Sequence, residues 1–154
     1  MNSPKIKSFR EITAVVKKLK KSGKRIVFTN GCFDILHIGH VKLLDRAKSF
    51  GDVLIVGLNS DSSVRKIKGP GRPVNREDDR AGVLAALSAV DFVVKFFQPT
   101  PHELIKNIMP DVLVKGSDWV GGKIVGREFA GIVRRVQLKK GYSTTGTIEK
   151  INKL

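Results

Sequence analysis

The stretch RIVFTNGCFDILHIGH, residues 25–40, decides the fold. Its beginning, Arg25–Thr29, is a short apolar run of the kind that forms a strand buried in a sheet. Helical spacing follows over residues 39–50, where Val41, Leu44 and Ala47 recur on one face. The segment therefore predicts a strand, a turn and a helix in immediate succession.

The same alternation of strand and helix continues to the end of the chain. We predict further strands over residues 52–58, 92–96, 112–114 and 132–138, helices over 76–89, 100–108 and 144–151, and a polar loop over residues 59–75 that ends in KGPGRPVN. Continuous apolar strands that alternate with helices predict a parallel sheet covered on both faces, with right-handed crossovers. The fold class is therefore α/β, a Rossmann-like doubly wound parallel sheet of about five strands in a single domain.

The beginning of the chain is strongly basic. The 154 residues carry a formal net charge of +15, and nine of the 29 basic residues lie in the first 25 positions, against the single acidic residue Glu11. Apolar residues recur there at helical spacing from Ile6 to Leu19, which predicts an amphipathic helix with a solvated basic face. We accordingly divide the chain into a basic N-terminal helix, residues 1–24, and a domain over residues 25–154.

Composition excludes several classes of protein. A content of 41% hydrophobic residues supports a folded core, and no apolar run approaches the roughly 20 residues that cross a bilayer. The sequence starts without the apolar stretch of a secretory signal, and a single cysteine excludes an internal disulfide or a cysteine metal cluster. We expect a cytoplasmic protein with no transmembrane segment. The excess of positive charge favours anionic partners: nucleic acid, a membrane surface or small phosphorylated molecules.

Two histidines at the turn after the first long strand predict a phosphate site. Ligands of doubly wound sheets bind beyond the carboxyl ends of the strands. The dinucleotide fingerprint GxGxxG and the phosphate loop GxxxxGK[ST] are both missing there, which excludes ordinary dehydrogenases and P-loop kinases. Instead, His37 and His40 lie three positions apart on the first turn of a helix, beside its unpaired N–H groups, and Gly39 places no side chain between them. An anion can approach this turn closely.

The motifs in the chain resemble a known family. GCFDILHIGH, residues 31–40, looks like the signature of the HxGH nucleotidyltransferase superfamily of cytidylyltransferases and adenylyltransferases. Further similar motifs are Asn59–Asp61, residues 68–87, VDFVV at 90–94, PDVLVKGSDW at 110–119 and GYSTTGTIEKI at 141–151. Within the superfamily, this series is most similar to the D-glycero-β-D-manno-heptose 1-phosphate adenylyltransferases, which make ADP-heptose for the lipopolysaccharide core. The chain carries no kinase part and resembles the stand-alone form, and residues 25–154 would be the nucleotidyltransferase domain.

The resemblance implies a set of site residues. His37, His40 and Lys68 would be catalytic. The nucleotide would be bound by Cys32, Phe33, Asp34, Gly39, Gly116, Asp118, Ser143, Thr144 and Thr145. The phosphorylated acceptor would be bound by Lys66, Arg72 and Arg80. Trp119 either stacks on the nucleotide or covers core, Asp34 also orders its loop, and Cys32 is a small packed residue and no nucleophile.

The implied reaction moves AMP from ATP to the sugar phosphate and releases pyrophosphate. The attacking phosphate oxygen is already ionised at neutral pH, so catalysis needs cations and N–H donors and no general base. Mg²⁺ would accompany ATP, whose phosphates supply most of its ligands, and no dedicated metal cluster is predicted. The family also implies a homodimer that acts on ATP and a sugar phosphate and holds no stable nucleic acid.

Two alternatives remain open. A CTP-dependent glycerol-3-phosphate cytidylyltransferase shares the fold and the HxGH motif, but such enzymes carry Arg-Thr-Glu-Gly where this chain has Leu138–Gly141. The high positive charge also suggests an RNA-binding protein, although the sequence has one Trp, one Tyr and no aromatic-rich strand for stacking bases.

Overall fold

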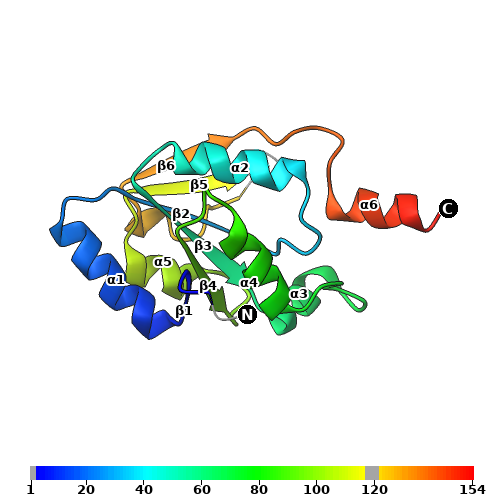
Figure 1. Cartoon of the computed structure of the whole chain (residues 1–154), viewed down its shortest axis with the longest axis horizontal. Coiled ribbons are helices and arrows are strands. Elements are labelled where there is room, and N and C mark those ends of the chain that lie inside the picture. The colour runs from blue at the N-terminus through cyan, green and yellow to red at the C-terminus, as the bar shows by residue number, and fades with distance from the viewer. Residues whose placement is uncertain (1–2, 117–121) are drawn as a thin grey trace.

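The strands form one parallel sheet. The computed structural model describes residues 3–116 and 122–154, and within them six strands lie in the order β1-β4-β3-β2-β5-β6 (Figure 1). Their bounds are β1 (Ile6–Lys7), β2 (Ile26–Gly31), β3 (Val53–Asn59), β4 (Phe92–Phe96), β5 (Val112–Gly116) and β6 (Ile132–Val136). All neighbouring pairs are parallel. The predicted α/β fold with a parallel sheet is therefore confirmed.

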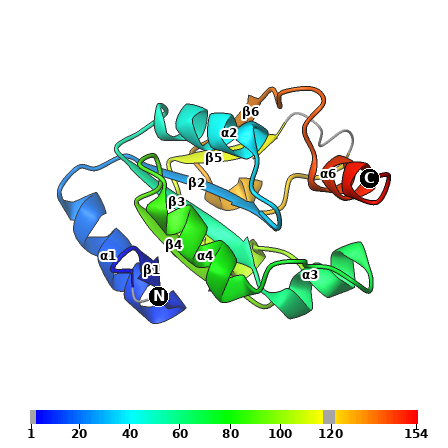
Figure 2. The ribbon, with the colours of Figure 1, turned by 45° about the vertical axis from the view of Figure 1, so that its right-hand side comes forward.

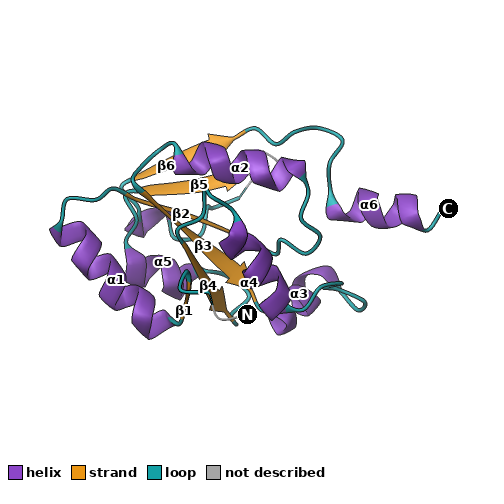
Figure 3. Ribbon diagram, viewed as in Figure 1, coloured by secondary structure: helices purple, strands orange, loops and turns teal. Residues whose placement is uncertain are grey.

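Helices flank the sheet on both faces, as Figure 3 shows. In the described residues they are α1 (Phe9–Lys21), α2 (Ile38–Lys48), α3 (Asp61–Lys68), α4 (Glu77–Ala86), α5 (His102–Ile108) and α6 (Thr144–Ile151), with a 3₁₀ turn at Arg127–Phe129. Successive residues of a strand face opposite sides. Val27 packs with residues of α2 and α4, whereas Ile26 and Phe28 pack with residues of α1 and α5. Two separate cores result, one on each face of the sheet.

The sixth strand corrects the predicted count of about five. Ile6, which the helical spacing placed in the first helix, lies in β1 and pairs with Val93 of β4. The helix starts later because Ser8 and Glu11 form a capping box, in which each side chain accepts a hydrogen bond from the other residue's backbone N–H. The chain is therefore extended up to Ser8 and helical from Phe9.

The segment after β3 is a helix, where the sequence predicted only a polar loop. Ser60 caps α3 by accepting a hydrogen bond from the backbone N–H of Ser63. The helix buries only Ser63 and Val64, so it lacks the apolar stripe by which helices are recognised in sequence. The rest of the predicted loop, residues 69–75, connects α3 to α4 without a strand or helix.

The order in which the chain adds strands to the sheet reverses between β2 and β5. From β2 the chain moves outward through β3 to β4, then crosses back to the other side of β2 for β5 and β6. β2 and β5 pair only through Val27 with Val112 and Phe28 with Leu113, although both strands continue beyond these pairs. The Thr29 hydroxyl then donates to the Val114 carbonyl at 3.0 Å. A crevice at the carboxyl end of these two strands is the usual ligand site of such sheets.

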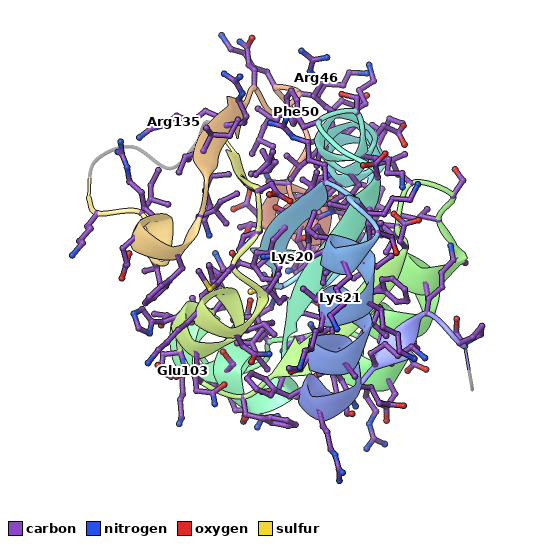
Figure 4. All side chains as sticks on the ribbon, turned by 90° about the vertical axis from the view of Figure 1, so that its left-hand side faces the viewer. Lys20, Lys21, Arg46, Phe50, Glu103 and Arg135 are labelled. Atoms are coloured by element: carbon purple, nitrogen blue, oxygen red, sulfur yellow. The ribbon has the colours of Figure 1, made fainter. Side chains whose placement is uncertain are left out.

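The basic face of α1 points to solvent, as predicted. Ile12 and Val16 are buried under the helix, while Lys17, Lys18, Lys20 and Lys21 are exposed. Figure 4 views the molecule from this side, with Lys20 and Lys21 on the helix nearest the viewer. Together with β1, α1 belongs to the same sheet and core as the rest of the described chain.

The last helix lies apart from the sheet. α6 projects away from the sheet in Figures 1 and 2, and none of its residues is buried. In the part of the chain that the structure describes, no helix has the length and apolar character needed to cross a membrane.

Candidate active site

A cavity of about 300 Å³ lies at the carboxyl edge of the sheet. It is bounded by three segments far apart in sequence: the turn from β2 to α2, the end of α3 with the loop after it, and the segment from β6 to α6. The lining residues are Cys32, Phe33, Asp34, His37, Gly39, His40, Lys68, Arg72, Leu138, Lys139, Tyr142, Ser143, Thr144 and Thr145. The structure thus brings the two histidines and the distal hydroxyl residues around one space.

The two imidazoles stack against each other. The ring centroids of His37 and His40 are 3.8 Å apart, with 18° between the ring planes. A Cβ on Gly39 would come within 3.0 Å of the His37 ring, so glycine gives this ring its place. The ring centroid of Phe33 lies 5.2 Å from that of His40, in an edge-on contact. The Phe33 backbone has a φ of 42°, a region that non-glycine residues rarely occupy. Packing therefore fixes both rings.

Both histidines are neutral around pH 7. Burial lowers the pKa of His40 to about 4, with a smaller contribution from the neighbouring His37, and burial likewise lowers the pKa of His37. The Nδ1 atoms of both rings are buried and have no hydrogen-bond partner among the described residues. Two adjacent, half-buried rings whose Nδ1 atoms have no partner among the described residues are suited to an anion, which would accept hydrogen bonds from their N–H groups and raise both pKa values.

Hydroxyl groups face the imidazoles across the cavity. Ser143 caps α6, with its side chain accepting from the backbone N–H of Gly146 at 3.0 Å. The Thr144 hydroxyl donates to the carbonyl of Ile35, which links the start of α6 to the turn after β2. Thr145 lines the same cavity. The N-termini of α2 and α6 both border the cavity, and their first-turn N–H groups add partial positive charge.

Asp34 holds the turn after β2 in shape. Its carboxylate is buried, accepts from the Arg72 guanidinium at 2.7 Å and from the backbone N–H groups of Val74 and Asn75 at 2.8 and 3.0 Å. The Asn75 amide donates back to the Asp34 carbonyl. Arg72 therefore borders the cavity as one half of an ion pair, and Asp34 orders the loop, as the sequence analysis expected of it.

Arg80 differs from its expected role at the acceptor. Arg80 is 2% exposed, and its guanidinium donates to the carbonyls of Asn75, Cys32 and Asn59 and to the Asp61 carboxylate. It does not line the main cavity. Because these hydrogen bonds tie together the turns after β2 and β3, Arg80 supports the site from beneath and has few donors left for a substrate.

The two predicted lysines of α3 lie in different places. Lys68 borders the main cavity, whereas Lys66 is exposed on the helix and lines none of the described cavities. Lys139 and Tyr142, which the sequence analysis did not single out, both line the cavity, with the Lys139 ammonium 4.8 Å from the centre of the Tyr142 ring. Both residues lie in the loop between the last strand and Ser143, and this position at a strand end was the sequence signal that could have identified them as site residues.

The remaining predicted residues are one cavity residue, Cys32, and the residues at and after the end of β5. Cys32 lies at the cavity wall, and burial raises the pKa of its thiol, which fits a packed residue and no nucleophile. Gly116 ends β5 at the same edge of the sheet. Asp118 and Trp119 lie outside the described residues.

A second cavity, of about 370 Å³, adjoins the first and shares Cys32 and Lys68 with it. Its walls are largely apolar, formed by Ile67, Pro99, Pro101, Ile124 and Val125, with polar groups from Asn30, Asn59, Thr100 and Lys115. Burial lowers the pKa of Lys115 to about 8, and its ammonium donates to the side-chain oxygen of Asn30. None of the predicted acceptor residues lines this second cavity.

The site has the donors for an anion and few ligands for a metal. Among residues 3–116 and 122–154, no three His, Cys, Asp or Glu side chains are grouped so that they could hold a metal ion. Asp34 is the one carboxylate that lines the main cavity within the described chain, and both its oxygens are engaged. Hydroxyls of Ser143, Thr144 and Thr145 remain as neutral oxygen ligands.

Comparisons with known proteins point to one family. A family model described as cytidylyltransferase-like matches residues 28–150. The bifunctional protein HldE of Sulfurimonas denitrificans is 64% identical over 95% of this chain and 31% of its own length. The HldE of Aliarcobacter butzleri is 58% identical, with the same shares covered. The chain therefore spans about a third of the length of these curated relatives.

Solved structures share the fold. A lipopolysaccharide core biosynthesis protein from Thermoplasma volcanium superposes with a TM-score of 0.64 at 28% identity, over 79% of this chain and 100% of that chain. A pantoate-beta-alanine ligase from Francisella tularensis, complexed with an ATP analogue and beta-alanine, gives a TM-score of 0.59 over 96% of this chain and 76% of that chain. At 18% identity, this second likeness concerns the fold alone.

Proposed function

The chain belongs to the cytidylyltransferase-like family, and on that premise we propose that it transfers AMP from ATP to D-glycero-β-D-manno-heptose 1-phosphate, giving ADP-heptose and pyrophosphate. The observation that carries the proposal is the single cavity in which the His37–His40 pair faces the N-terminus of α6. A triphosphate fits this arrangement because its charge meets N–H donors, hydroxyls and lysines from all sides.

Nucleotidyl transfer suits a site without a general base. The attacking oxygen belongs to a phosphate that is already ionised, so the chain has to bring two anions together and stabilise the charge that develops at the α-phosphate and on the leaving pyrophosphate. Lys68 borders both cavities, and in the proposed reaction it neutralises the two anions where they meet. Lys139 adds a further positive charge beside the α6 N-terminus.

The imidazoles supply N–H donors whose charge responds to the substrate. Both are neutral in the free protein because burial penalises the imidazolium. As negative charge shifts onto the leaving pyrophosphate, the hydrogen bonds from the imidazole N–H groups strengthen, and the pair stabilises the transition state more strongly than the bound substrates. This difference is what lowers a barrier, since equal stabilisation of both states would leave turnover unchanged.

Mg²⁺ is part of the proposal as a companion of ATP. The residues present fit such an ion only as minor ligands, through the hydroxyls of Ser143, Thr144 and Thr145, so phosphate oxygens would make most of the coordination. When bound, the ion would neutralise charge on the triphosphate.

The heptose acceptor is proposed from the sequence resemblance and from the relatives. The motifs of residues 31–40, 68–87, 110–119 and 141–151 resemble heptose 1-phosphate adenylyltransferases, and a structural relative at 28% identity is a lipopolysaccharide core biosynthesis protein. The glycerol-3-phosphate cytidylyltransferase alternative has the same chemistry with a different base and acceptor. The RNA-binding alternative finds no support in a polar cavity of this size.

A pyrophosphate-release matrix tests the proposal. ATP, CTP, GTP and UTP are each paired with heptose 1-phosphate, glycerol 3-phosphate and flavin mononucleotide. We expect release with ATP and heptose 1-phosphate at least tenfold above every other pair. Highest turnover with CTP and glycerol 3-phosphate would replace the substrates and keep the chemistry, whereas RNA retention with steep salt dependence and no pyrophosphate release would overturn the enzyme assignment.

Two further parts of the proposal concern the protein as a whole. We propose a homodimer, by resemblance to the family, and a cytoplasmic location, because a single cysteine suits a reducing compartment. Light scattering of the purified chain measures the first, and fractionation of cells that express it measures the second.

A further inference from the structure

The second cavity contains a cation whose role is unassigned. Of the three residues predicted to bind the acceptor, Lys66 is exposed outside the cavities, Arg80 is buried under the loops and Arg72 is paired with Asp34. Lys68 is shared with the triphosphate at the junction of the two cavities, so the acceptor needs a further positive group of its own. Lys115 lies near the carboxyl end of β5 and lines the second cavity. Among the described residues, no carboxylate lies within ion-pair distance of it.

The position of Lys115 follows from the opening between β2 and β5. Regular pairing of these strands ends at Phe28 and Leu113, and two residues further along each strand the Lys115 ammonium reaches across to the Asn30 side chain. An ammonium has three N–H donors, and this hydrogen bond uses one. Burying a cation without a counter-charge costs free energy, and for the same reason burial lowers the pKa of Lys115. A protein retains such a group where a ligand supplies the missing partner.

We propose that the second cavity receives the phosphorylated polyol acceptor and that Lys115, positioned by Asn30, is the residue that selects it. The inference rests on the proposed function, since it takes nucleotidyl transfer to a sugar phosphate as given. The two cavities adjoin at Cys32 and Lys68, so an acceptor phosphate at this junction lies beside the triphosphate of the first cavity. The sugar then extends between apolar walls, where its hydroxyls accept from the two remaining N–H groups of Lys115, and the acceptor phosphate brings into the same cavity the negative charge that Lys115 lacks.

The acceptor suits this cavity better than the nucleotide base does. Adenine is neutral and is recognised by its amino group as well as by its ring nitrogens, and an ammonium offers no acceptor to an amino group. A sugar phosphate is an anion with many hydroxyl oxygens, which suits an ammonium, an amide and the hydroxyl of Thr100 on one wall. The apolar walls formed by Pro99, Pro101 and Val125 cover the carbon skeleton of a bound sugar.

Steady-state kinetics of Lys115→Met test the proposal. Methionine keeps the length of the side chain and removes its charge, and because it also removes a buried cation we expect the variant to fold. The Michaelis constant for the acceptor should rise at least tenfold, while the constant for ATP changes less than twofold. The matched control is Lys106→Met on α5, an exposed lysine outside the cavities, which should leave both constants unchanged. A rise in the ATP constant alone would place the base in the second cavity and overturn the proposal.

A second readout measures the same contact without turnover. Reductive methylation requires a neutral and accessible amine. Because the pKa of Lys115 is lowered to about 8 and its side chain borders the second cavity, Lys115 should be labelled early at pH 8 in the free protein. Heptose 1-phosphate should slow that labelling at least fivefold, and ATP alone should slow it less than twofold. Unchanged labelling with the sugar phosphate would refute the contact.

Failure of the inference and failure of the proposed function give different results. If the wild type uses another phosphorylated acceptor from the matrix, the heptose assignment fails, and Lys115→Met should still raise the Michaelis constant of that acceptor. If the wild type uses heptose 1-phosphate and Lys115→Met keeps the wild-type constant, the proposed function stands and the role of Lys115 is wrong.

Discussion

The half-buried imidazole of His40 should make folding stability depend on pH. Its pKa lies at about 4 in the folded protein, against its usual value of 6.5. Between these values the unfolded chain binds the proton more readily, so stability is fully present above pH 6.5 and is lost as the pH falls towards 4. One pKa unit corresponds to about 1.4 kcal/mol, so the full pKa difference between the folded and unfolded chain corresponds to about 3 kcal/mol of stability. About 2 kcal/mol of this is lost between pH 7 and pH 5. Because the ring is partly exposed in the cavity, we expect about half of that, about 1 kcal/mol.

Urea unfolding of the wild type and of His40→Asn at pH 7 and pH 5 measures this contribution. The carboxylates titrate in both proteins and cancel in the comparison. The wild type should lose about 1 kcal/mol more than the variant between the two pH values. His102→Asn serves as the control, since His102 lies at the start of α5 and pairs with Glu103 and Glu128, away from the cavity. Because His102→Asn keeps His40 and the cavity unchanged, it should retain the loss that His40 causes in the wild type.

Pyrophosphate connects this titration to the function. If the imidazoles bind phosphate, saturating pyrophosphate should stabilise the charged ring and reduce the wild-type loss on acidification, with no such effect in His40→Asn. Equal pH dependence of the wild type and His40→Asn would mean that the ring is well solvated. Equal dependence with and without pyrophosphate in the wild type would mean that the anion binds elsewhere.

Three further substitutions, one of them with a matched control, separate stability from activity. Gly39→Ala places a methyl group 3.0 Å from the His37 ring, so kcat/KM should fall on the order of tenfold or more while the unfolding free energy changes by less than about 1 kcal/mol; unchanged turnover would show that ring placement is not critical. Arg80→Met should lower the free energy of unfolding in urea by about 2–4 kcal/mol, because buried carbonyls lose their donor. The control Lys95→Met breaks a more exposed ion pair and should cost less than about 1 kcal/mol. Similar costs for the two variants would contradict a supporting role for Arg80. Ser143→Ala should leave the unfolding midpoint nearly unchanged, since α6 buries nothing, and should raise the Michaelis constant for ATP; a change in the midpoint alone would make the serine a plain helix cap.

The sequence predicted the central strands because they are continuously apolar. The predicted ranges of β2, β3, β4 and β5 lie within two residues of the observed ends. The periphery was harder for physical reasons. β1 has two residues, one of which also matched the helical spacing of the next element, and α3 shows no apolar stripe because it buries only Ser63 and Val64. Short or polar elements are held by tertiary contacts and caps, which a single sequence displays weakly.

The site was predictable where its residues are adjacent in the chain. His37, Gly39 and His40 form one contiguous motif, as do Ser143, Thr144 and Thr145, and the structure brings both motifs to one cavity. The surroundings of a charge were not visible in the sequence. Arg80 and Lys66 looked alike as basic residues near a strand end, yet one is buried under three carbonyls and the other faces solvent.

Lys115 and Asn30 were missed because their relation is made by the sheet. They are 85 positions apart and meet only because β2 and β5 are neighbours on the two sides of the switch in strand order. Had these strands paired along their whole length, ladder hydrogen bonds would close the crevice between them. The departure from regular pairing after Phe28 and Leu113 therefore does two things at once. It opens the edge of the sheet beside the second cavity, and it leaves the half-buried Lys115 ammonium without a carboxylate partner among the described residues. The irregularity that costs the fold backbone pairing thus supplies the cation by which we propose that the site selects its acceptor.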